Sequence, residues 1–500
     1  MVLTYTLQLQ LRETALRLLP GSVRLLTSCG FEKFSNLYVL KTNSNATLIT
    51  GVAFSFTCAK HGFQYSDTRG NMNILIVGAG GVGSAVASII ETRSFYKKVI
   101  LADFDASVSQ AALDALDDSS RFQAVQVDAK SRTELLRLMR ETEANVVLNA
   151  CDPRLNQSIF DAAFEAGCTY VDMASSLSKP DALRPYEIAG ELLGAYELAM
   201  DESWSSKGLL ALVGMGVEPG LSNIFARYAA DHLFDTIDEI GVRDGSNLSI
   251  DGYDFAPTFS IWTTIEECLN PPLIWERERG YYTTECFSEP EVFHFPSGIG
   301  PVECVNVEHE EVVLIPRQVE CDRVTFKYGL GSEFINWLKT FAYLGLDSKE
   351  LVTVGSSKVA PRDVLAAVLP NPAKLGHLMH GKTCAGTWVK GTLDGVSREL
   401  YLYHVADNET TMREWGAQAV LWQTAVCPVV ALELLATGVW AGTGVKGPDA
   451  FDSVPFLNLL GEYGTHHGMV ELGSGLWPSP RPASKPSWDR PVQRPSVRLR

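Results

Sequence analysis

The chain has 500 residues, of which 46% are hydrophobic and 20% are charged, and its formal net charge at pH 7 is −17. This composition excludes intrinsic disorder as the state of most of the chain, and the acidic balance argues against nucleic acid as a partner, since phosphate binding relies on a basic surface. No run of 18 uncharged apolar residues occurs, so we expect no membrane span.

The charge is distributed unevenly. Residues 1–71 have a balance of +4 and residues 473–500 a balance of +5, which leaves −26 for residues 72–472. Residues 1–71 show no alternation of strands and helices, and three interpretations stay open for them: an upstream extension with Met72 as the working start, an organellar transit sequence, or an additional structural element. We expect neither end to carry the chemistry.

From Met72 onward, apolar strands alternate with helices. Strands are predicted at 73–77, 98–103, 122–128, 144–151, 169–174 and 208–216. Helices are predicted after the first strand and at 108–116, 133–142, 155–167 and 182–200. Continuously apolar strands that alternate with helices indicate a parallel sheet covered on both faces, which predicts an α/β fold with a doubly wound, Rossmann-type sheet.

The first strand leads directly into Gly78-Ala-Gly80-Gly-Val-Gly83, a GxGxxG motif that opens a helix. Its glycines permit a tight turn, a close approach of the backbone to a pyrophosphate, and close packing of helix on strand. Asp103, 20 residues after Gly83, ends the next strand, where a carboxylate accepts hydrogen bonds from an adenosine ribose and repels a 2′-phosphate. NAD is therefore predicted rather than NADP. The predicted coenzyme-binding residues are Gly78, Gly80, Gly81, Val82, Gly83, Asp103, Asp128, Ala150 and Cys151.

Polar side chains end three later strands of the same sheet. Asp152 follows the fourth strand, Asp172 ends the fifth, and Glu218 lies in the loop after the sixth. Ligands bind at the carboxyl ends of such strands, so these three carboxylates are the predicted catalytic acids or bases. The alternatives are helix capping for Asp152, and a turn or plain burial for Asp172 and Glu218.

The residue composition of the predicted strands changes near residue 236. Strand-like runs rich in aromatic and β-branched residues are predicted as strands at 236–242, 253–264, 311–315, 323–328 and 398–405. Prolines and glycines interrupt them, which indicates a mixed or antiparallel second domain. Residues 417–437 then predict a long apolar helix that returns to the first domain. The tail 473–500, with six prolines, is predicted to be disordered.

Cysteine usage bears on the cell compartment. The ten cysteines form no CxxC pair and show no Cys/His spacing of a metal site. This predicts reduced thiols, no bound metal and a cytoplasmic protein. Organellar import through residues 1–71 is the alternative.

From Met72 to about Leu472 the chain resembles the saccharopine dehydrogenase family, which includes proteins similar to saccharopine reductase, lysine 6-dehydrogenase and carboxynorspermidine dehydrogenase. The resemblance is carried by GAGGVG with Asp103, and by NACDPRLN, CTYVDMA, GMGVEPGLSN and GVWAGTG. The chain departs from the family at residues 242–246, where saccharopine reductases have a turn similar to Cys-Gly-Gly-Leu-Pro.

The resemblance implies a Rossmann domain that is interrupted by a mixed α/β domain. The implied segments are an NAD-binding domain at 72–220, a substrate and dimerisation domain at 221–415, and a helical segment at 416–472 that returns to the Rossmann domain. A homodimer is therefore expected.

The implied activity is hydride transfer between a nicotinamide and the CH–NH group of an amino acid of saccharopine or lysine type, through an imine and without a metal. The substrate-binding candidates are Asn223, Arg243 and Arg317, because guanidinium groups bind carboxylates bidentately; an ion pair within the protein is the alternative role of each arginine. Two other functions stay open: a polyamine-precursor enzyme similar to carboxynorspermidine dehydrogenase, and a catalytically silent NAD-binding regulatory protein.

Overall fold

The structure, a computed structural model, describes residues 41–42, 45–46, 70–465, 467–473 and 477–483. The chain divides into two compact units, Met1–Ser66 and Asp67–Arg500. In the first unit the described strands are β1 (Lys41–Thr42) and β2 (Asn45–Ala46), which pair antiparallel. The three interpretations of residues 1–71 and the predicted disorder of 484–500 lie outside the described residues. All sites below belong to the second unit.

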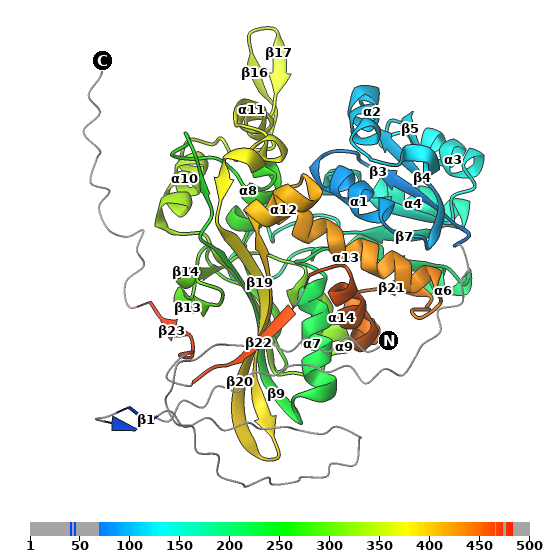
Figure 1. Cartoon of the computed structure of the whole chain (residues 1–500). Helices are drawn as coiled ribbons and strands as arrows, with labels where there is room; N and C mark the ends of the chain where they lie inside the picture. Colours follow the sequence, from blue (N-terminus) through cyan, green and yellow to red (C-terminus); the bar gives the residue numbers. More distant parts are fainter. Residues whose placement is uncertain (1–40, 43–44, 47–69, 466, 474–476, 484–500) are drawn as a thin grey trace, which may run out of the picture. The chain divides into compact units, whose positions relative to one another are not determined.

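A parallel sheet of seven strands forms the first half of the second unit (Figure 1). Its strands, in spatial order, are β21 (Gly444–Lys446), β8 (Leu210–Leu212), β7 (Thr169–Asp172), β6 (Val146–Asn149), β3 (Met72–Val77), β4 (Tyr96–Asp103) and β5 (Phe122–Gln126). Without β21 this is the strand order of the Rossmann fold, and the direction of winding reverses between β3 and β6. The predicted α/β fold of Rossmann type is confirmed, and the crevice at that reversal is the expected binding place.

The helices of this half mostly follow the prediction. They are α1 (Gly81–Glu91), α2 (Ala106–Asp114), α3 (Arg132–Glu141), α4 (Asn156–Ala166), α5 (Ala195–Ala199) and α6 (Asp201–Ser206). The long helix predicted at 182–200 is wrong, because residues 182–194 are irregular. Gly194 there has a φ of 68°, a left-handed conformation that glycine adopts readily and that interrupts a helix.

A mixed sheet forms the second half. Its main path is β22 (His467–Glu471), β20 (Val396–Asp407), β19 (Lys382–Leu393), β9 (Thr236–Ser246), β15 (Arg323–Gly329), β14 (Gly300–Asn306), β13 (Glu291–Phe295) and β23 (Arg481–Pro482). β9 and β15 run parallel, and the other neighbours on this path are antiparallel. β11 (Leu273–Glu276) pairs with β15 and with β12 (Gly280–Thr283). β23 belongs to the segment predicted as a disordered tail.

Smaller elements complete this half. They are the strands β10 (Ser249–Ile250), β16 (Val352–Val354), β17 (Ser357–Val359) and β18 (Met379–His380), and the helices α7 (Leu221–His232), α10 (Ser332–Tyr343), α11 (Pro361–Val368), α12 (Asn408–Trp415) and α14 (Ser453–Glu462).

Two strands predicted in the second half are wrong. Residues 253–264 form a loop that enters α8 (Ile261–Leu269), and residues 311–315 begin α9 (Glu311–Gln318). The Ser260 side chain caps α8 by accepting from the Thr263 N–H. Short apolar runs do not distinguish a buried helix from a strand. Here the aromatic and β-branched residues favoured the prediction of strands.

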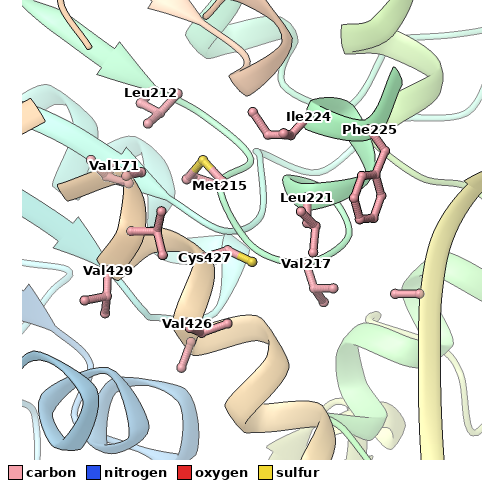
Figure 2. Packing of buried hydrophobic residues seen from close by; sticks show 14 of the residues in the cluster. Val171, Leu212, Met215, Val217, Leu221, Ile224, Phe225, Val426, Cys427 and Val429 are labelled. Atoms are coloured by element: carbon pink, nitrogen blue, oxygen red, sulfur yellow. The ribbon is translucent and has the colours of Figure 1, made fainter. Parts of the chain in front are cut away.

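The long apolar helix is α13 (Ala419–Ala436), and it packs beside α1 of the Rossmann half (Figure 1). In the described part of the chain it is the one helix long and apolar enough to cross a membrane, and most of it is buried within the protein, as in a core helix. Figure 2 shows side chains from β7, β8, α7 and α13 packed around the loop that carries Met215 and Val217. This packing fixes the loop in which Glu218 lies.

Candidate active site

A cavity of about 1150 Å³ lies between the two halves, at the carboxyl ends of β6 and β7. The Rossmann side contributes Gly81 and Val82, residues 149–153 and residues 217–219. The second half contributes the end of β9, the loop 248–260, and parts of α8, β15 and the segment after α11. The cavity therefore coincides with the crevice where Rossmann-type sheets bind their ligands.

The glycine loop has the shape that a dinucleotide requires. Gly78 has a φ of 98°, and a Cβ there would lie 2.6 Å from the carbonyl oxygen of Ala150; a Cβ on Gly83 would overlap the carbonyl oxygen of Gly78. Both glycines are thus required by the packing of the chain itself. By contrast, a Cβ on Gly80 would meet no atom within 4 Å, and the start of α1 has no side-chain cap. The open space at Gly80 therefore leaves the first N–H groups of α1 free to bind the phosphates of a dinucleotide.

Asp103 holds the shape of this loop from the end of β4. Its Oδ2 accepts from the Ala79 N–H at 2.9 Å, and its Oδ1 accepts from the Asp105 N–H at 3.0 Å. Each carboxylate oxygen can accept a second hydrogen bond, which leaves capacity for ribose hydroxyls. Asp128 instead accepts from the Lys130 N–H and does not line the cavity. Ala150 and Cys151 line the cavity beside the loop.

Asp152 lines the cavity, but both of its carboxylate oxygens are bonded to Arg154. Its two oxygens accept from Arg154 Nε at 2.8 Å and Nη2 at 2.9 Å. Arg154 also lies over the Trp262 ring, at 4.0 Å from its centroid, and contacts Asp363, so the pair links the Rossmann half to the second half. Through this bidentate ion pair, the structure gives Asp152 a role in joining the two halves.

Asp172 does not reach the cavity. Its side chain is 1% exposed and its Oδ1 accepts from the Gly214 N–H at 2.6 Å. Burial, with the neighbouring charge of Glu197, holds the pKa of Asp172 well above its usual value. In the structure Asp172 is apart from the cavity, and its bond to Gly214 holds the loop that leads to Glu218.

Glu218 lines the cavity, together with five carboxyl groups that were not predicted from the sequence. These are Asp244 on β9, Asp254, Glu267 on α8, Glu310 before α9 and Glu333 on α10. Burial raises the pKa of Glu218 well above its usual value, that of Asp244 to about 7 and that of Glu267 to about 8. Carboxyl groups that exchange protons near neutral pH suit acid–base catalysis.

His309 supplies a cation behind these acids. Its Nδ1 lies 2.5 Å from Glu311 Oε2, its Nε2 lies 3.0 Å from the Tyr328 hydroxyl, and its ring stacks on Phe326. Burial alone would lower its pKa, but Glu311, followed by Glu310 and Glu267, outweighs burial and raises the pKa of His309 to about 10. His309 is therefore an imidazolium at neutral pH.

The same residues have metal-binding side chains. One ligand atom each of His309, Glu310 and Glu311 lies within 4.8 Å of the others. The 2.5 Å contact between His309 and Glu311 is that of an imidazolium–carboxylate ion pair. Within this cluster the imidazolium of His309 therefore balances the charge of Glu311.

The three residues predicted to bind substrate lie elsewhere. Arg243, 1% exposed, bonds Glu291 at 2.6 Å in a buried ion pair of the mixed sheet. Asn223 accepts from the Gly220 N–H at 3.0 Å and donates to Asp449 at 3.2 Å, which fixes the start of α7. Arg317 is exposed at the end of α9. None of the three lines the cavity, so the structure does not bring them together with the other predicted site residues.

The lining of the cavity is acidic. Its carboxyl groups are Asp152, Glu218, Asp244, Asp254, Glu267, Glu310 and Glu333. Among the described residues that line it there is no lysine, arginine or histidine. A ligand of this cavity meets negative charge and neutral polar groups.

Comparison with known proteins agrees with this arrangement. Residues 74–212 match the saccharopine dehydrogenase NADP binding domain, and residues 216–465 match the saccharopine dehydrogenase C-terminal domain. Carboxynorspermidine synthase of Vibrio cholerae is 29% identical over 413 residues, which cover 81% of this chain and 98% of that protein. Carboxyaminopropylagmatine dehydrogenase of Synechocystis sp. is 28% identical over 393 residues, which cover 78% of this chain and 96% of that protein.

The fold has a solved counterpart. The L-Glu-forming saccharopine dehydrogenase of Saccharomyces cerevisiae superposes with a TM-score of 0.58 at 12% identity, covering 80% of this chain and 100% of that one. The matching domain families span both halves described above. The chain belongs to the saccharopine dehydrogenase family and is a nicotinamide-dependent oxidoreductase that acts on a CH–NH group of an amino-acid-type substrate.

Proposed function

We propose that the substrate is a polyamine-type cation that carries an amino-acid carboxylate, as in carboxynorspermidine or carboxyaminopropylagmatine. The observation that carries the proposal is the cavity lining, with seven carboxyl groups and no cationic side chain among its described residues. Ammonium groups compensate buried carboxylates, whereas the several carboxylates of saccharopine would require arginine or lysine partners. The names of two relatives support the same substrate class.

Each part of the site has a place in this chemistry. The start of α1 at Gly80 would hold the pyrophosphate, and Asp103 the adenosine ribose. Bound nicotinamide supplies or accepts the hydride. The carboxyl groups of the cavity wall attract the amine, and Glu267 takes the amine proton before hydride transfer. A homodimer, a cytoplasmic location and the absence of metal, membrane and nucleic-acid partners stay predictions.

A substrate panel tests this proposal. With NAD⁺, we expect oxidation of carboxynorspermidine or carboxyaminopropylagmatine with a kcat/KM at least about 100-fold above those of saccharopine and lysine, because unfavourable charge contacts cost several kcal/mol. The measurement is absorbance at 340 nm. Equal kcat/KM with saccharopine would overturn the substrate class, and tight coenzyme binding without turnover of any amine would favour the silent regulatory protein.

For the coenzyme, we propose a preference for NAD. Asp103 ends β4, the first helix after it is capped by the carboxylate of Asp105, and the segment 103–107 contains no basic residue that would pair with a 2′-phosphate. We expect wild type to bind NADH at least about tenfold more tightly than NADPH, since two unit charges at close range repel by more than about 1.4 kcal/mol.

The variant Asp103→Asn isolates the charge. It keeps one acceptor oxygen for the loop, and we expect it to reduce the NADH to NADPH preference about tenfold in fluorescence titrations. Asp105→Asn is the matched control, and its preference should stay within about threefold of wild type, because its carboxylate accepts from Ser107 at the start of α2. An unchanged preference in Asp103→Asn would refute the role of this charge.

A further inference from the structure

Glu218 and Asp244 form a pair of carboxyl groups at the boundary between the Rossmann half and the second half. Glu218 follows β8 of the Rossmann half, and Asp244 lies on β9 of the mixed sheet. Both line the cavity, and each carboxyl group shifts the pKa of the other, which places the two groups next to each other.

Two carboxyl groups in contact cannot both ionise in a buried site, so the pair retains one proton. Burial raises the pKa of both groups, and the charge of the partner raises that of Glu218 further. The titratable groups that face the pair from neighbouring elements are His309 before α9, Glu311 at the start of α9, Tyr328 on β15, Cys384 on β19, Tyr401 on β20 and Cys304 on β14. Only His309 among these is a cation at neutral pH.

Three of the other acids of the cavity already have partners within the protein. Glu310 Oε1 accepts from the Ser175 N–H at 2.9 Å, Glu267 accepts from the Tyr328 hydroxyl, and Asp152 is held by Arg154. In contrast, Oε1 of Glu218 is buried and has no hydrogen-bond partner among the described residues. A buried carboxyl oxygen without a partner, at the wall of the active-site cavity, points to a group supplied by the substrate.

We propose that Glu218 and Asp244 act as one acid–base group in the water step of the reaction, a role that rests on the proposed function. Water adds to the carbon of the substrate iminium, forming the C–O bond while the C=N π electrons pass to nitrogen. The proton that water loses goes to the pair, which then holds two protons instead of one. In the reverse direction the pair returns this proton to the hydroxyl group, which leaves as water.

Pre-steady-state kinetics separate this step from hydride transfer. With carboxynorspermidine and saturating NAD⁺, Asp244→Asn and Glu218→Gln should still produce a burst of about one NADH per site, because hydride transfer precedes water addition. Steady-state turnover should fall by about 10² to 10⁴-fold, the usual contribution of general acid–base catalysis. The pH dependence of turnover should also lose its acidic limb in both variants. A burst slowed as much as turnover, or unchanged turnover, would overturn the proposal.

The matched control is Asp238→Asn, the same substitution at an exposed position of the same strand, which should leave burst and turnover unchanged. A second measurement needs no substrate. Infrared spectra of the full chain at pH 7 should show several protonated carboxyl bands, since Glu267 and Asp172 also hold protons, and the difference between wild type and Asp244→Asn or Glu218→Gln should show the loss of one of them. Two ionised groups in wild type at pH 7 would refute the shared proton even if the substrate class were correct. Lack of turnover with a shared proton present would instead refute the proposed function.

Discussion

Replacing Gly80 with aspartate should abolish coenzyme binding and leave the protein folded. Gly80 is the N-cap of α1, with a φ of −69° that any residue adopts, and a Cβ there meets no atom within 4 Å. Aspartate is a favoured N-cap, so its carboxylate would occupy the free N–H groups that we assign to the pyrophosphate. We expect the Kd of NADH in a fluorescence titration to rise by more than about 100-fold, equivalent to about 2.7 kcal/mol.

Two companion variants make this test specific. Gly80→Asn has the same shape without the charge and should lose less affinity than Gly80→Asp. Gly83→Ala should behave in the opposite way, with loss of stability, because its Cβ would overlap the carbonyl oxygen of Gly78. Thermal unfolding separates the two effects. If Gly80→Asp binds NADH like wild type, this loop is not the phosphate site.

The Rossmann half was predictable because its signals are local. A continuous apolar strand such as β3, followed at once by the glycines of residues 78–83, determines strand, turn and helix within a dozen residues. Asp103 follows from spacing alone. Asp152 and Asp172 were found at strand ends for the same reason, but spacing does not show whether a carboxylate faces a ligand, an arginine or a backbone N–H.

The acids of the second half were missed for two physical reasons. On β9, Arg243 and Asp244 are neighbours, so their side chains leave the strand on opposite faces. Arg243, the predicted substrate-binding residue, forms the ion pair with Glu291, whereas Asp244 lines the cavity. Residues 311–315 were predicted as a strand, but they begin α9. Glu310 and His309, which directly precede this helix, were therefore not recognised as site residues. In both cases the outcome depends on which distant elements pack against these residues, and a single sequence does not show this packing.

The group that balances these acids is His309, and its replacement by glutamine should destabilise the fold strongly. The change removes the imidazolium and leaves Glu311, fully buried, with the Ser222 hydroxyl as its remaining bond at 2.7 Å. Breaking a buried ion pair from one side costs about 3–5 kcal/mol. We expect this decrease in the free energy of unfolding at pH 6, measured by urea denaturation with tryptophan fluorescence.

The matched control is His380→Gln. His380 pairs with Asp251 and Glu409 at the surface, where ion pairs contribute little, so its replacement should change the free energy of unfolding by less than about 1 kcal/mol. The double variant His309→Gln with Glu311→Gln should be more stable than His309→Gln alone, because both charges are then removed together.

The dependence on pH identifies the mechanism. In wild type the pKa of His309 is raised to about 10, so its contribution is complete below its unfolded pKa of about 6.5 and is lost as the pH rises through 10. His309→Gln lacks this contribution. The loss of unfolding free energy relative to wild type should therefore be full at pH 6 and shrink to less than about half between pH 6 and pH 9.5. A loss that stays constant over this range would mean that His309 stabilises the fold by packing on Phe326, and the Glu311 charge would need another partner.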